Sequence, residues 1–298
     1  MKLVLCVKRD LHGCMFLNQL LPQLAGHELH VLLSDKTRPA EQQIPALREL
    51  AYLERSLPCD RLFPLLDRQL VSGEWATFAG LEERYDVALE VVEDVNAPSL
   101  VDRLATFAPD LIVSARFSHI FQPQVIAIAR HGAVNIHPGE LPVYAGLFAP
   151  MRTIAEGGGT LVSCMHFIDG GIDTGPVIAT RHLPFRTDEG LLEQIAELYV
   201  LAIPLLLDLI ARLGRDEEIP SIPQDVSRRR YRSMPDANEV EAFLAAGHRF
   251  WKPRSYDALL ARFVPATPPA ADADARLAII ETIRSGEDLQ AFSFEDES

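Results

Sequence analysis

The stretch AVNIHPGELPVYAG, residues 133–146, ends a predicted strand with two polar side chains and a Pro-Gly break. Asn135 and His137 are two residues apart, so on a strand both point to the same face. In open α/β sheets ligands bind at the carboxyl ends of the strands, and we expect both side chains there. An amide and an imidazole at that edge can donate hydrogen bonds to one oxygen atom. The alternative is that Asn135 caps a turn and His137 has only a structural role.

A second motif, MHFIDGGIDTGPVI at residues 165–178, places His166, Asp169 and Asp173 in or beside a glycine-rich loop. Glycines allow tight turns and a close approach of the backbone to a ligand. A buried carboxylate beside an imidazole fixes the orientation of the ring and stabilises its charged form. The alternative is a plain hairpin in which the aspartates form turns.

Strands and helices alternate along the first half of the chain. This order predicts the α/β class, with a Rossmann-like, mostly parallel sheet flanked by helices. Two later strands, joined by the short glycine-rich loop, are expected to pair in antiparallel fashion. The predicted strands are residues 2–7, 28–33, 86–92, 111–115, 133–136, 160–168 and 176–183.

Helices are predicted where apolar residues recur at helical spacing. The longest is expected from about residue 189 to residue 213, with Gly214 at its end. Ser99 is a candidate N-cap for the helix that follows it, and residues 57–85 give no clear pattern. Further helices are predicted at residues 14–25, 41–55, 122–130, 148–156, 238–246 and 255–262.

The sequence changes in character after residue 214, where prolines become frequent and only short helices are predicted. We therefore expect a main domain at residues 1–214 and a small irregular C-terminal extension, packed on it, at residues 215–264. Residues 265–298 are expected to form a linker and an acidic tail.

The composition is typical of a soluble globular protein, with 298 residues of which 48% are apolar and 23% charged. The formal net charge of −14 repels phosphate backbones, which argues against nucleic acid as a partner. The apolar run at residues 198–207 is too short to cross a bilayer and indicates a buried helix. The N-terminus has no signal-peptide pattern, so a cytoplasmic location is expected. Four scattered cysteines indicate reduced, mostly buried thiols.

Together, the two motifs resemble those of the folate-dependent formyltransferases. This family includes glycinamide ribonucleotide transformylase, methionyl-tRNA formyltransferase and the sugar-amine N-formyltransferases, with the pattern N-x-H-P-S-x-L-P followed by a histidine strand and D-x-G-x-D-T-G-P. The resemblance covers roughly residues 80–215, and residues 1–80 by fold only. It implies the formyltransferase fold, a catalytic trio of Asn135, His137 and Asp173, and 10-formyltetrahydrofolate as the formyl donor.

The chemistry that the resemblance implies suits these side chains. Formyl transfer to an amine puts negative charge on the formyl oxygen. Asn135 and a charged His137, held by Asp173, would donate hydrogen bonds to that oxygen, and such donors commonly contribute about 2.7–4 kcal/mol each. Asp173 could also help to move the proton from the attacking amine. No metal is required in this scheme.

The donor pocket follows by alignment with the same family. The segment SARFSHIFQP, residues 114–123, takes the place of the pterin-binding loop, with apolar walls from its phenylalanines and isoleucine. The alternative is that these aromatic side chains simply belong to the core. The expected donor-binding residues are Phe117, His119, Ile120, Phe121, His166, Ile168, Asp169, Gly170 and Gly171.

Several positions depart from the family pattern and bear on the acceptor. The segment VKRDLHGCMF, residues 7–16, has one glycine where the glycinamide ribonucleotide enzyme has a glycine- and serine-rich phosphate loop. Gly139 replaces the usual serine, and Ala145 replaces the basic residue before Gly146. The basic cluster SRRRYRS, residues 227–233, is a candidate for acceptor binding through Arg228, Arg230 and Tyr231, or for pairing with acidic surfaces.

The sequence therefore predicts an N-formyltransferase that acts on a small primary amine, such as an amino-sugar nucleotide or a hydroxylated diamino acid. The alternatives are a 10-formyltetrahydrofolate hydrolase, an enzyme like methionyl-tRNA formyltransferase, and a non-catalytic folate-binding regulator. Neither a membrane nor nucleic acid is expected as a partner. The oligomeric state is left open, with a homodimer among the options.

Overall fold

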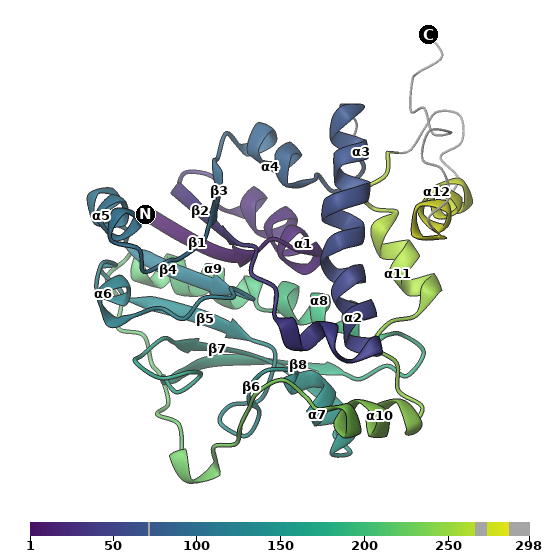
Figure 1. Cartoon of the computed structure of the whole chain (residues 1–298). Coiled ribbons are helices and arrows are strands. Elements are labelled where there is room, and N and C mark those ends of the chain that lie inside the picture. The colour runs from purple at the N-terminus through teal and green to yellow at the C-terminus, as the bar shows by residue number, and fades with distance from the viewer. Residues whose placement is uncertain (71, 266–272, 286–298) are drawn as a thin grey trace.

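A seven-stranded sheet runs through the centre of the computed structural model, which describes residues 1–70, 72–265 and 273–285 (Figure 1). The strand order is β3-β2-β1-β4-β5-β7-β8. The strands from β3 to β5 pair in parallel, whereas β7 pairs antiparallel with both β5 and β8. This arrangement confirms the predicted Rossmann-like, mostly parallel sheet. The strands are β1 (Lys2–Lys8), β2 (Glu28–Ser34), β3 (Leu89–Val92), β4 (Leu111–Ala115), β5 (Ala133–His137), β7 (Thr160–Phe167) and β8 (Val177–Pro184).

Helices cover both faces of the sheet (Figure 1). The α-helices are α1 (Leu11–Leu20), α2 (Pro45–Ala51), α3 (Phe63–Arg68), α4 (Phe78–Tyr85), α5 (Pro98–Phe107), α6 (Pro123–Ile126), α7 (Ala149–Ala155), α8 (Leu191–Leu201), α9 (Ile203–Leu213), α10 (Ala237–Ala245), α11 (Pro253–Leu260) and α12 (Ala273–Ser285). Three short 3-10 helices are η1 (Leu21–Gln23), η2 (Pro39–Gln42) and η4 (Val226–Arg228), and η3 (Tyr52–Leu62) is a π-helix.

The two faces of β1 belong to two different cores. Leu3, Leu5 and Val7 lie in the large core, whereas Val4 and Cys6 lie in the smaller core under α5 and α6. This division follows from the alternation of side chains along a strand. Both faces are buried, as expected for a parallel strand that is flanked by helices.

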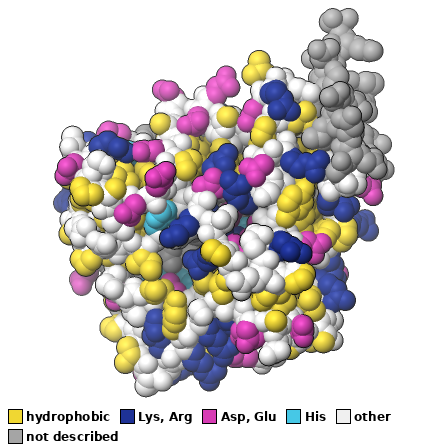
Figure 2. Space-filling model, viewed as in Figure 1, with side chains coloured by type: hydrophobic (Ala, Val, Ile, Leu, Met, Phe, Trp, Pro, Cys, Tyr) yellow, Lys and Arg dark blue, Asp and Glu magenta, His cyan; other side chains and the backbone are white. Residues whose placement is uncertain are grey.

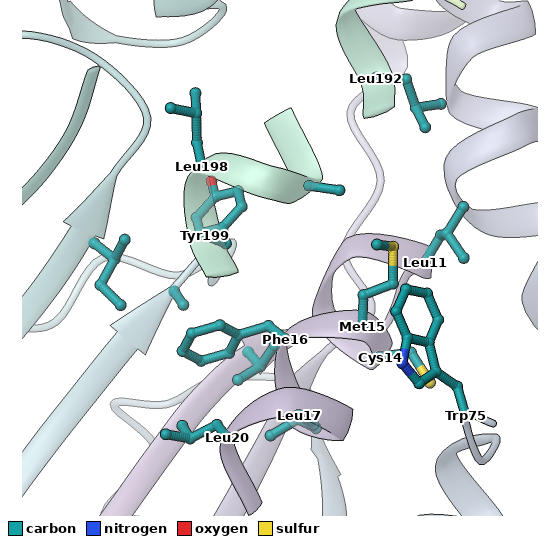
Figure 3. Close-up of a cluster of buried hydrophobic side chains, with 14 of the residues drawn as sticks. Leu11, Cys14, Met15, Phe16, Leu17, Leu20, Trp75, Leu192, Leu198 and Tyr199 are labelled. Atoms are coloured by element: carbon teal, nitrogen blue, oxygen red, sulfur yellow. The ribbon is translucent and has the colours of Figure 1, made fainter. Parts of the chain in front are cut away.

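The large core is centred where α1 meets α8 (Figure 3). Phe16 and Leu17 on α1 pack near Leu198 and Tyr199 on α8, and Trp75 closes the other side. All five side chains are at most 4% exposed. Full burial of an apolar side chain of this size contributes about 1.5–3 kcal/mol each, so this contact fixes α1, and with it the end of β1.

A second, two-stranded sheet joins the C-terminal extension to the loop after β5. It pairs β6 (Ala145–Gly146) with β9 (Tyr231–Arg232) in parallel. Gly146 has φ +93°, and a Cβ atom there would lie 2.1 Å from the carbonyl oxygen of Arg232. Only glycine fits this close approach with such a backbone, which explains why Gly146 follows Ala145 at this point.

The long helix predicted at residues 189–213 is in fact two helices. α8 ends at Leu201 and α9 begins at Ile203, because Pro204 in the first turn of α9 has no N–H to continue the α8 ladder. By length and composition, Leu191–Leu213 is the one helical stretch among the described residues that could cross a membrane, but half of it is buried inside the protein. It packs as a core element, as the sequence predicts for residues 198–207.

Other helix boundaries differ from the predictions. Ala97, not Ser99, is the N-cap of α5, because Pro98 takes the first helical position. The unclear segment at residues 57–85 continues η3 into α3 and then forms α4. The helix predicted at residues 122–130 is confined to α6. The prediction of a linker and tail at residues 265–298 is wrong for residues 273–285, which form α12 and place Ile280 and Ile283 in the large core. The rest of that prediction lies outside the described residues, apart from residue 265.

Candidate active site

Asn135 and His137 lie at the carboxyl end of β5, on one face, as the sequence predicts. Their strand pairs antiparallel with β7, where Asn135 is opposite His166 and His137 is opposite Cys164. The β5–β7 ladder therefore brings the two motifs together, although 31 positions separate Asn135 from His166. His137 and His166 are 4% and 2% exposed.

A chain of hydrogen bonds orients the amide of Asn135. Nδ1 of His166 lies 2.7 Å from the carbonyl oxygen of Phe167, which can only accept, so the ring donates there. Nε2 of this ring then accepts from Nδ2 of Asn135 at 3.2 Å. One N–H of the amide is held in this way, and the second remains available to a ligand.

Both nitrogens of His137 face oxygen atoms. Nε2 donates to the carbonyl oxygen of Tyr144 at 2.7 Å, and Nδ1 lies 3.7 Å from Oδ2 of Asp173. Nε2 therefore carries a proton, and Nδ1 faces the carboxylate of Asp173. Gly139 allows this packing, because a Cβ atom at that position would lie 2.9 Å from Nε2 of His137 and 2.5 Å from Cβ of Ala149. A larger side chain at position 139 would therefore displace the ring or Ala149.

Asp173 is placed between the two histidines. Its Oδ1 lies 3.7 Å from Nε2 of His166, and its Oδ2 accepts the N–H of Gly146 at 2.8 Å. Burial on its own would raise the pKa of Asp173, but His137 and the Gly146 N–H oppose burial, and this pKa lies well below its usual range. Asp173 is therefore a carboxylate at neutral pH.

The backbone of Asp173 is strained and is held from the C-terminal extension. Its φ of 53° is in the left-handed region, which costs a non-glycine residue roughly 1–2 kcal/mol. Nε2 of Gln224 donates to the carbonyl oxygens of Asp173 at 3.1 Å and of Gly175 at 2.7 Å. Gln224 and the β6–β9 pairing thus fix the loop that carries the carboxylate.

The loop after β4 presents the aromatic residues expected at the donor pocket. Phe117 and Phe121 are stacked, with ring centroids 5.6 Å apart and an interplanar angle of 19°. Phe121 is buried, but Ile120 is 64% exposed at the same wall. Nε2 of His119 is buried without a hydrogen-bond partner. An exposed apolar side chain beside an orphaned polar atom is the kind of lining that a flat, polar-edged ligand completes.

One cavity of about 380 Å³ connects the trio with this loop. Ile168, Asp169 and Gly171 line it as predicted, whereas Gly170 does not. Oδ1 of Asp169 accepts hydrogen bonds from the N–H of Gly171 at 3.0 Å and the hydroxyl of Thr174 at 2.5 Å, which shapes the glycine-rich loop. The other predicted residues on its wall are Phe117, His119, Ile120, Phe121, Asn135, His137, His166 and Asp173.

The segment that carries this geometry matches a known family. Residues 89–198 fit the family model described as "Formyl transferase". This segment of the chain is related to the formyl transferases. This segment begins at β3, ends within α8 and includes both motifs. The predicted family resemblance is confirmed.

The segment that aligns with sequence relatives covers only part of each relative. Methionyl-tRNA formyltransferase from Syntrophomonas wolfei subsp. wolfei is 28% identical over 153 residues, which are 51% of this chain and 48% of the relative. The enzyme of that name from Nitrosomonas europaea is 34% identical over 122 residues, 40% of this chain and 37% of the relative. The chain thus spans about half or less of the length of these relatives.

Solved structures of other formyltransferases share the fold. A 4-N formyltransferase from Francisella tularensis has a TM-score of 0.53 at 14% identity, covering 82% of this chain and 87% of that one. A sugar N-formyltransferase from Shewanella sp FDAARGOS_354 has a TM-score of 0.51 at 15% identity, covering 83% and 87%. At this identity the likeness establishes the fold alone.

The basic cluster at residues 227–233 is largely outside the cavity. Of the three predicted acceptor contacts, only Tyr231 lines the cavity, whereas Arg228 is exposed on η4. Arg230 and Arg232 pair with Glu156, at 3.6 and 2.6 Å. The alternative interpretation, pairing with acidic groups, is thus correct for Arg230 and Arg232.

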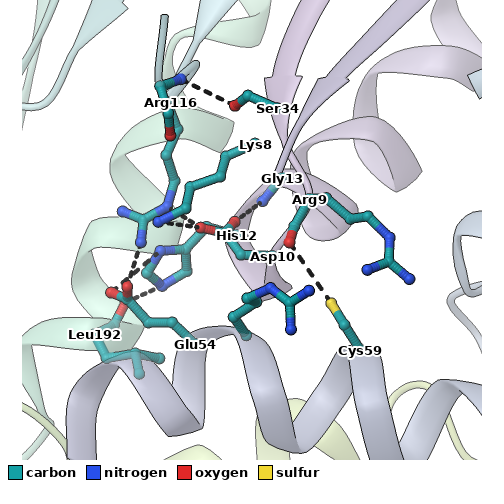
Figure 4. Close-up of polar contacts among 12 residues, drawn as sticks. Lys8, Arg9, Asp10, His12, Gly13, Ser34, Glu54, Cys59, Arg116 and Leu192 are labelled. Carbon is teal, nitrogen blue, oxygen red and sulfur yellow. Dashed lines mark hydrogen bonds and ion pairs between the residues drawn. The ribbon is translucent and has the colours of Figure 1, made fainter. Parts of the chain in front are cut away.

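A buried network of charges was not predicted from the sequence (Figure 4). Arg116, which follows β4, donates to Asp10 at 2.5 Å and also to Glu54 on η3. Burial, together with the Arg116 charge, lowers the pKa of His12 to about 4, although Glu54 opposes this change. Lys8 completes the network, 3.8 Å from Asp10. The only sequence signal was the cluster of charged residues directly after the first strand.

Among the residues that the structure describes, no group of three or more His, Cys, Asp or Glu side chains could hold a metal ion. The four cysteines are buried free thiols. Burial raises the pKa of Cys59 and of Cys164 to about 12, so both are protonated at neutral pH.

Proposed function

We propose that the protein is an N-formyltransferase that moves a formyl group from 10-formyltetrahydrofolate to a small primary amine. The observation that carries this proposal is that Asn135, His137 and Asp173 line one cavity together with the aromatic loop after β4. The match of residues 89–198 to the formyl transferases supports it.

The donor pocket fits a flat heterocycle such as a pterin. Ile120 and the stacked Phe117 and Phe121 give apolar walls, and the unpartnered Nε2 of His119 offers a polar contact. The N–H and C=O groups of the glycine-rich loop, through Gly171, can meet a polar ring edge. 10-Formyltetrahydrofolate, when bound there, would supply the formyl group.

The side chains of the trio divide the work of transfer. The free N–H of Asn135 donates to the formyl oxygen as that oxygen gains negative charge. His137 shares its Nε2 proton between that oxygen and the Tyr144 carbonyl, and Asp173 faces the other ring nitrogen. The amine nitrogen bonds to the formyl carbon while the bond from that carbon to the folate nitrogen breaks. Asp173, directly or through water, carries the amine proton toward the released nitrogen.

An activity like that of methionyl-tRNA formyltransferase is the second candidate, because relatives of that name match half of this chain. The net charge of −14 disfavours a large polyanion, and Glu156 already neutralises part of the basic cluster. A hydrolase would use the same trio with water in place of the amine, and a regulator would bind the donor without turnover.

The domain organisation and setting are part of the same proposal. Residues 1–214 form the catalytic unit, and residues 215–264 form an extension that completes the site through Gln224 and β9. Beyond this extension, α12 (Ala273–Ser285) packs against α11 and η3. The protein acts in the cytoplasm, with a small-molecule amine as its partner.

The test is an amine screen with 10-formyltetrahydrofolate, following tetrahydrofolate formation by the wild type and by His137→Ala. At least one amine should raise the rate above the water blank, and the variant should lose at least about 100-fold of that rate. Donor consumption that no amine accelerates would identify a hydrolase. A protein that binds the donor without consuming it would be a regulator, and either result refutes the transferase.

A further inference from the structure

The cavity has a charged end beside the aromatic loop, because Arg116 directly precedes Phe117. Its side chains come from the end of β1, the residue after β4, and the helical elements η2 and η3. Figure 4 shows three of them: Lys8, Glu54 and Arg116. Figure 2 shows Lys and Arg side by side with Asp and Glu around the hollow on this face. We use "charged end" for five lining residues: Lys8, Arg38, Glu41, Glu54 and Arg116.

The charges at this end balance. Its three cations are matched by its two glutamates and by the fully buried carboxylate of Asp10, which both Lys8 and Arg116 contact. A diphosphate would bring at least two more negative charges without a matching excess of cations. A zwitterion adds one charge of each sign and preserves the balance.

Two members of the charged end are available for such a ligand. Arg38 lies directly before η2 and Glu41 lies within it, and both side chains are half-buried. Neither side chain has an ion pair or hydrogen bond to another described residue. Partly buried charges without a partner are costly unless a ligand or water pairs with them. One cation and one anion are thus free on the same short element.

The space continues beyond the charged end. A second hollow of about 180 Å³ shares Lys8, Glu41 and Glu54 with the main cavity and adds Arg48 and Arg55 to its wall. Arg55 is already paired with Asp35 and Asp60, so it supplies no free charge, whereas Arg48 is exposed and has no ion pair to another described residue. The two hollows meet at Lys8, Glu41 and Glu54.

Apolar side chains line the cavity between its polar groups. Phe148 and Met151, which follow the loop that carries His137, line the cavity. Leu50, one turn before Glu54, and Leu192 line it as well. The carbonyl oxygen of Leu192 accepts the ring N–H of His12. An aliphatic chain suits these walls. The hydroxyl groups of a sugar would lose hydrogen bonds to water there.

We propose that the charged end binds the zwitterionic head group of an amino acid whose side-chain amine reaches Asn135, His137 and Asp173. The carboxylate pairs with Arg38 and Lys8, and the α-ammonium group pairs with Glu41 and Glu54. This inference rests on the proposed formyl transfer and names the class of acceptor for that same site: a diamino acid.

The test compares acceptors that differ only in the head group, with 10-formyltetrahydrofolate and the full chain. L-Ornithine, L-lysine and N5-hydroxy-L-ornithine carry the complete zwitterion, putrescine lacks the carboxylate, and 5-aminopentanoate lacks the α-amine. We expect kcat/KM for the best diamino acid to exceed that of either truncated amine by at least about tenfold. A nucleotide-linked amino sugar represents the competing class.

Two variants separate recognition from folding. Arg38→Met should raise KM for the diamino acid about tenfold but leave putrescine unaffected, and Glu41→Gln should do the same with 5-aminopentanoate as the insensitive amine. Arg130→Met, at an exposed site elsewhere, is the matched control.

The outcomes are distinct. Equal use of truncated and complete amines, or formylation of the amino-sugar nucleotide alone, overturns the zwitterion site and leaves formyl transfer intact. Failure of every amine to accelerate donor consumption refutes the proposed function itself, and this inference with it.

Discussion

Oδ2 of Asp173 lies 3.7 Å from Nδ1 of His137 and accepts the N–H of Gly146 at 2.8 Å. The carboxylate comes from a strained loop between β7 and β8, whereas the ring comes from the end of β5. Two hydrogen bonds from Gln224 hold the backbone of that loop. The arrangement thus depends on the sheet, the glycine-rich loop and the C-terminal extension together.

Replacement of Asp173 by asparagine should remove the negative charge and keep the shape. The ring of His137 then loses the anion that faces its Nδ1, so kcat should fall at least about 100-fold, with donor affinity nearly unchanged. Steady-state kinetics of tetrahydrofolate formation, with donor binding measured separately, check this. An active Asp173→Asn enzyme would rule out the carboxylate as a working member of the trio.

The buried ring of His12 should make stability depend on pH. Its folded pKa of about 4 is below the ordinary value of about 6.5, so the unfolded chain binds the extra proton between these values. The contribution is fully present above about pH 6.5 and declines as pH falls toward 4. Between pH 7.5 and pH 5 this loss is about 2 kcal/mol.

Urea unfolding at these two pH values, on the wild type and on His12→Gln, isolates that effect. Glutamine can still donate to the Leu192 carbonyl but does not titrate. The wild type should lose about 2 kcal/mol more than the variant. Parallel losses in the two proteins would show that the ring does not remain neutral in the fold.

Alanine at Gly146 should disrupt the junction between β6 and β9. The backbone there has φ +93°, and the new Cβ atom would lie 2.1 Å from the Arg232 carbonyl oxygen. Gly157 is a matched control, because its φ is +85° with nothing within 4 Å of a Cβ atom. Gly157→Ala should cost roughly 1–2 kcal/mol of unfolding free energy, and Gly146→Ala clearly more, with a lower kcat as well. Equal losses would mean that the β6–β9 contact is dispensable.

Serine at Ile120 should weaken donor binding without affecting the fold. The side chain is 64% exposed on the cavity wall, so little core packing is lost. We expect KM for the donor to rise several-fold with an unchanged Tm, since roughly 1–2 kcal/mol of apolar contact would be removed. Val226→Ser, at a side chain 76% exposed outside the cavity, is the control. An unchanged donor KM would remove Ile120 from the pocket.

Much of the fold could be predicted because its signals are local. Strand periodicity and the break at Pro138-Gly139 were enough to place Asn135 and His137 at one sheet edge. The two-helix structure of residues 191–213 was missed because Pro204 stands within a continuous apolar pattern. Proline is tolerated in a first helical turn, so its presence does not show where the preceding helix ends.

The charged end could not be predicted because it is assembled over long distances in the sequence. Arg116 contacts Asp10 across 106 positions and Glu54 across 62. Each of these residues taken alone is an ordinary charged residue near the end of a strand or in a helix. Only the order of β1 and β4 in the sheet, with η3 over their ends, makes them neighbours.

The most direct test of the central claim is the rate of tetrahydrofolate formation by Asn135→Asp, measured beside donor binding. Aspartate keeps the size of the side chain but replaces the donating amide by an acceptor, so it opposes the charge that develops on the formyl oxygen. We predict a loss of at least about 100-fold in kcat with the donor still bound. A variant that transfers formyl groups at the wild-type rate would contradict the account.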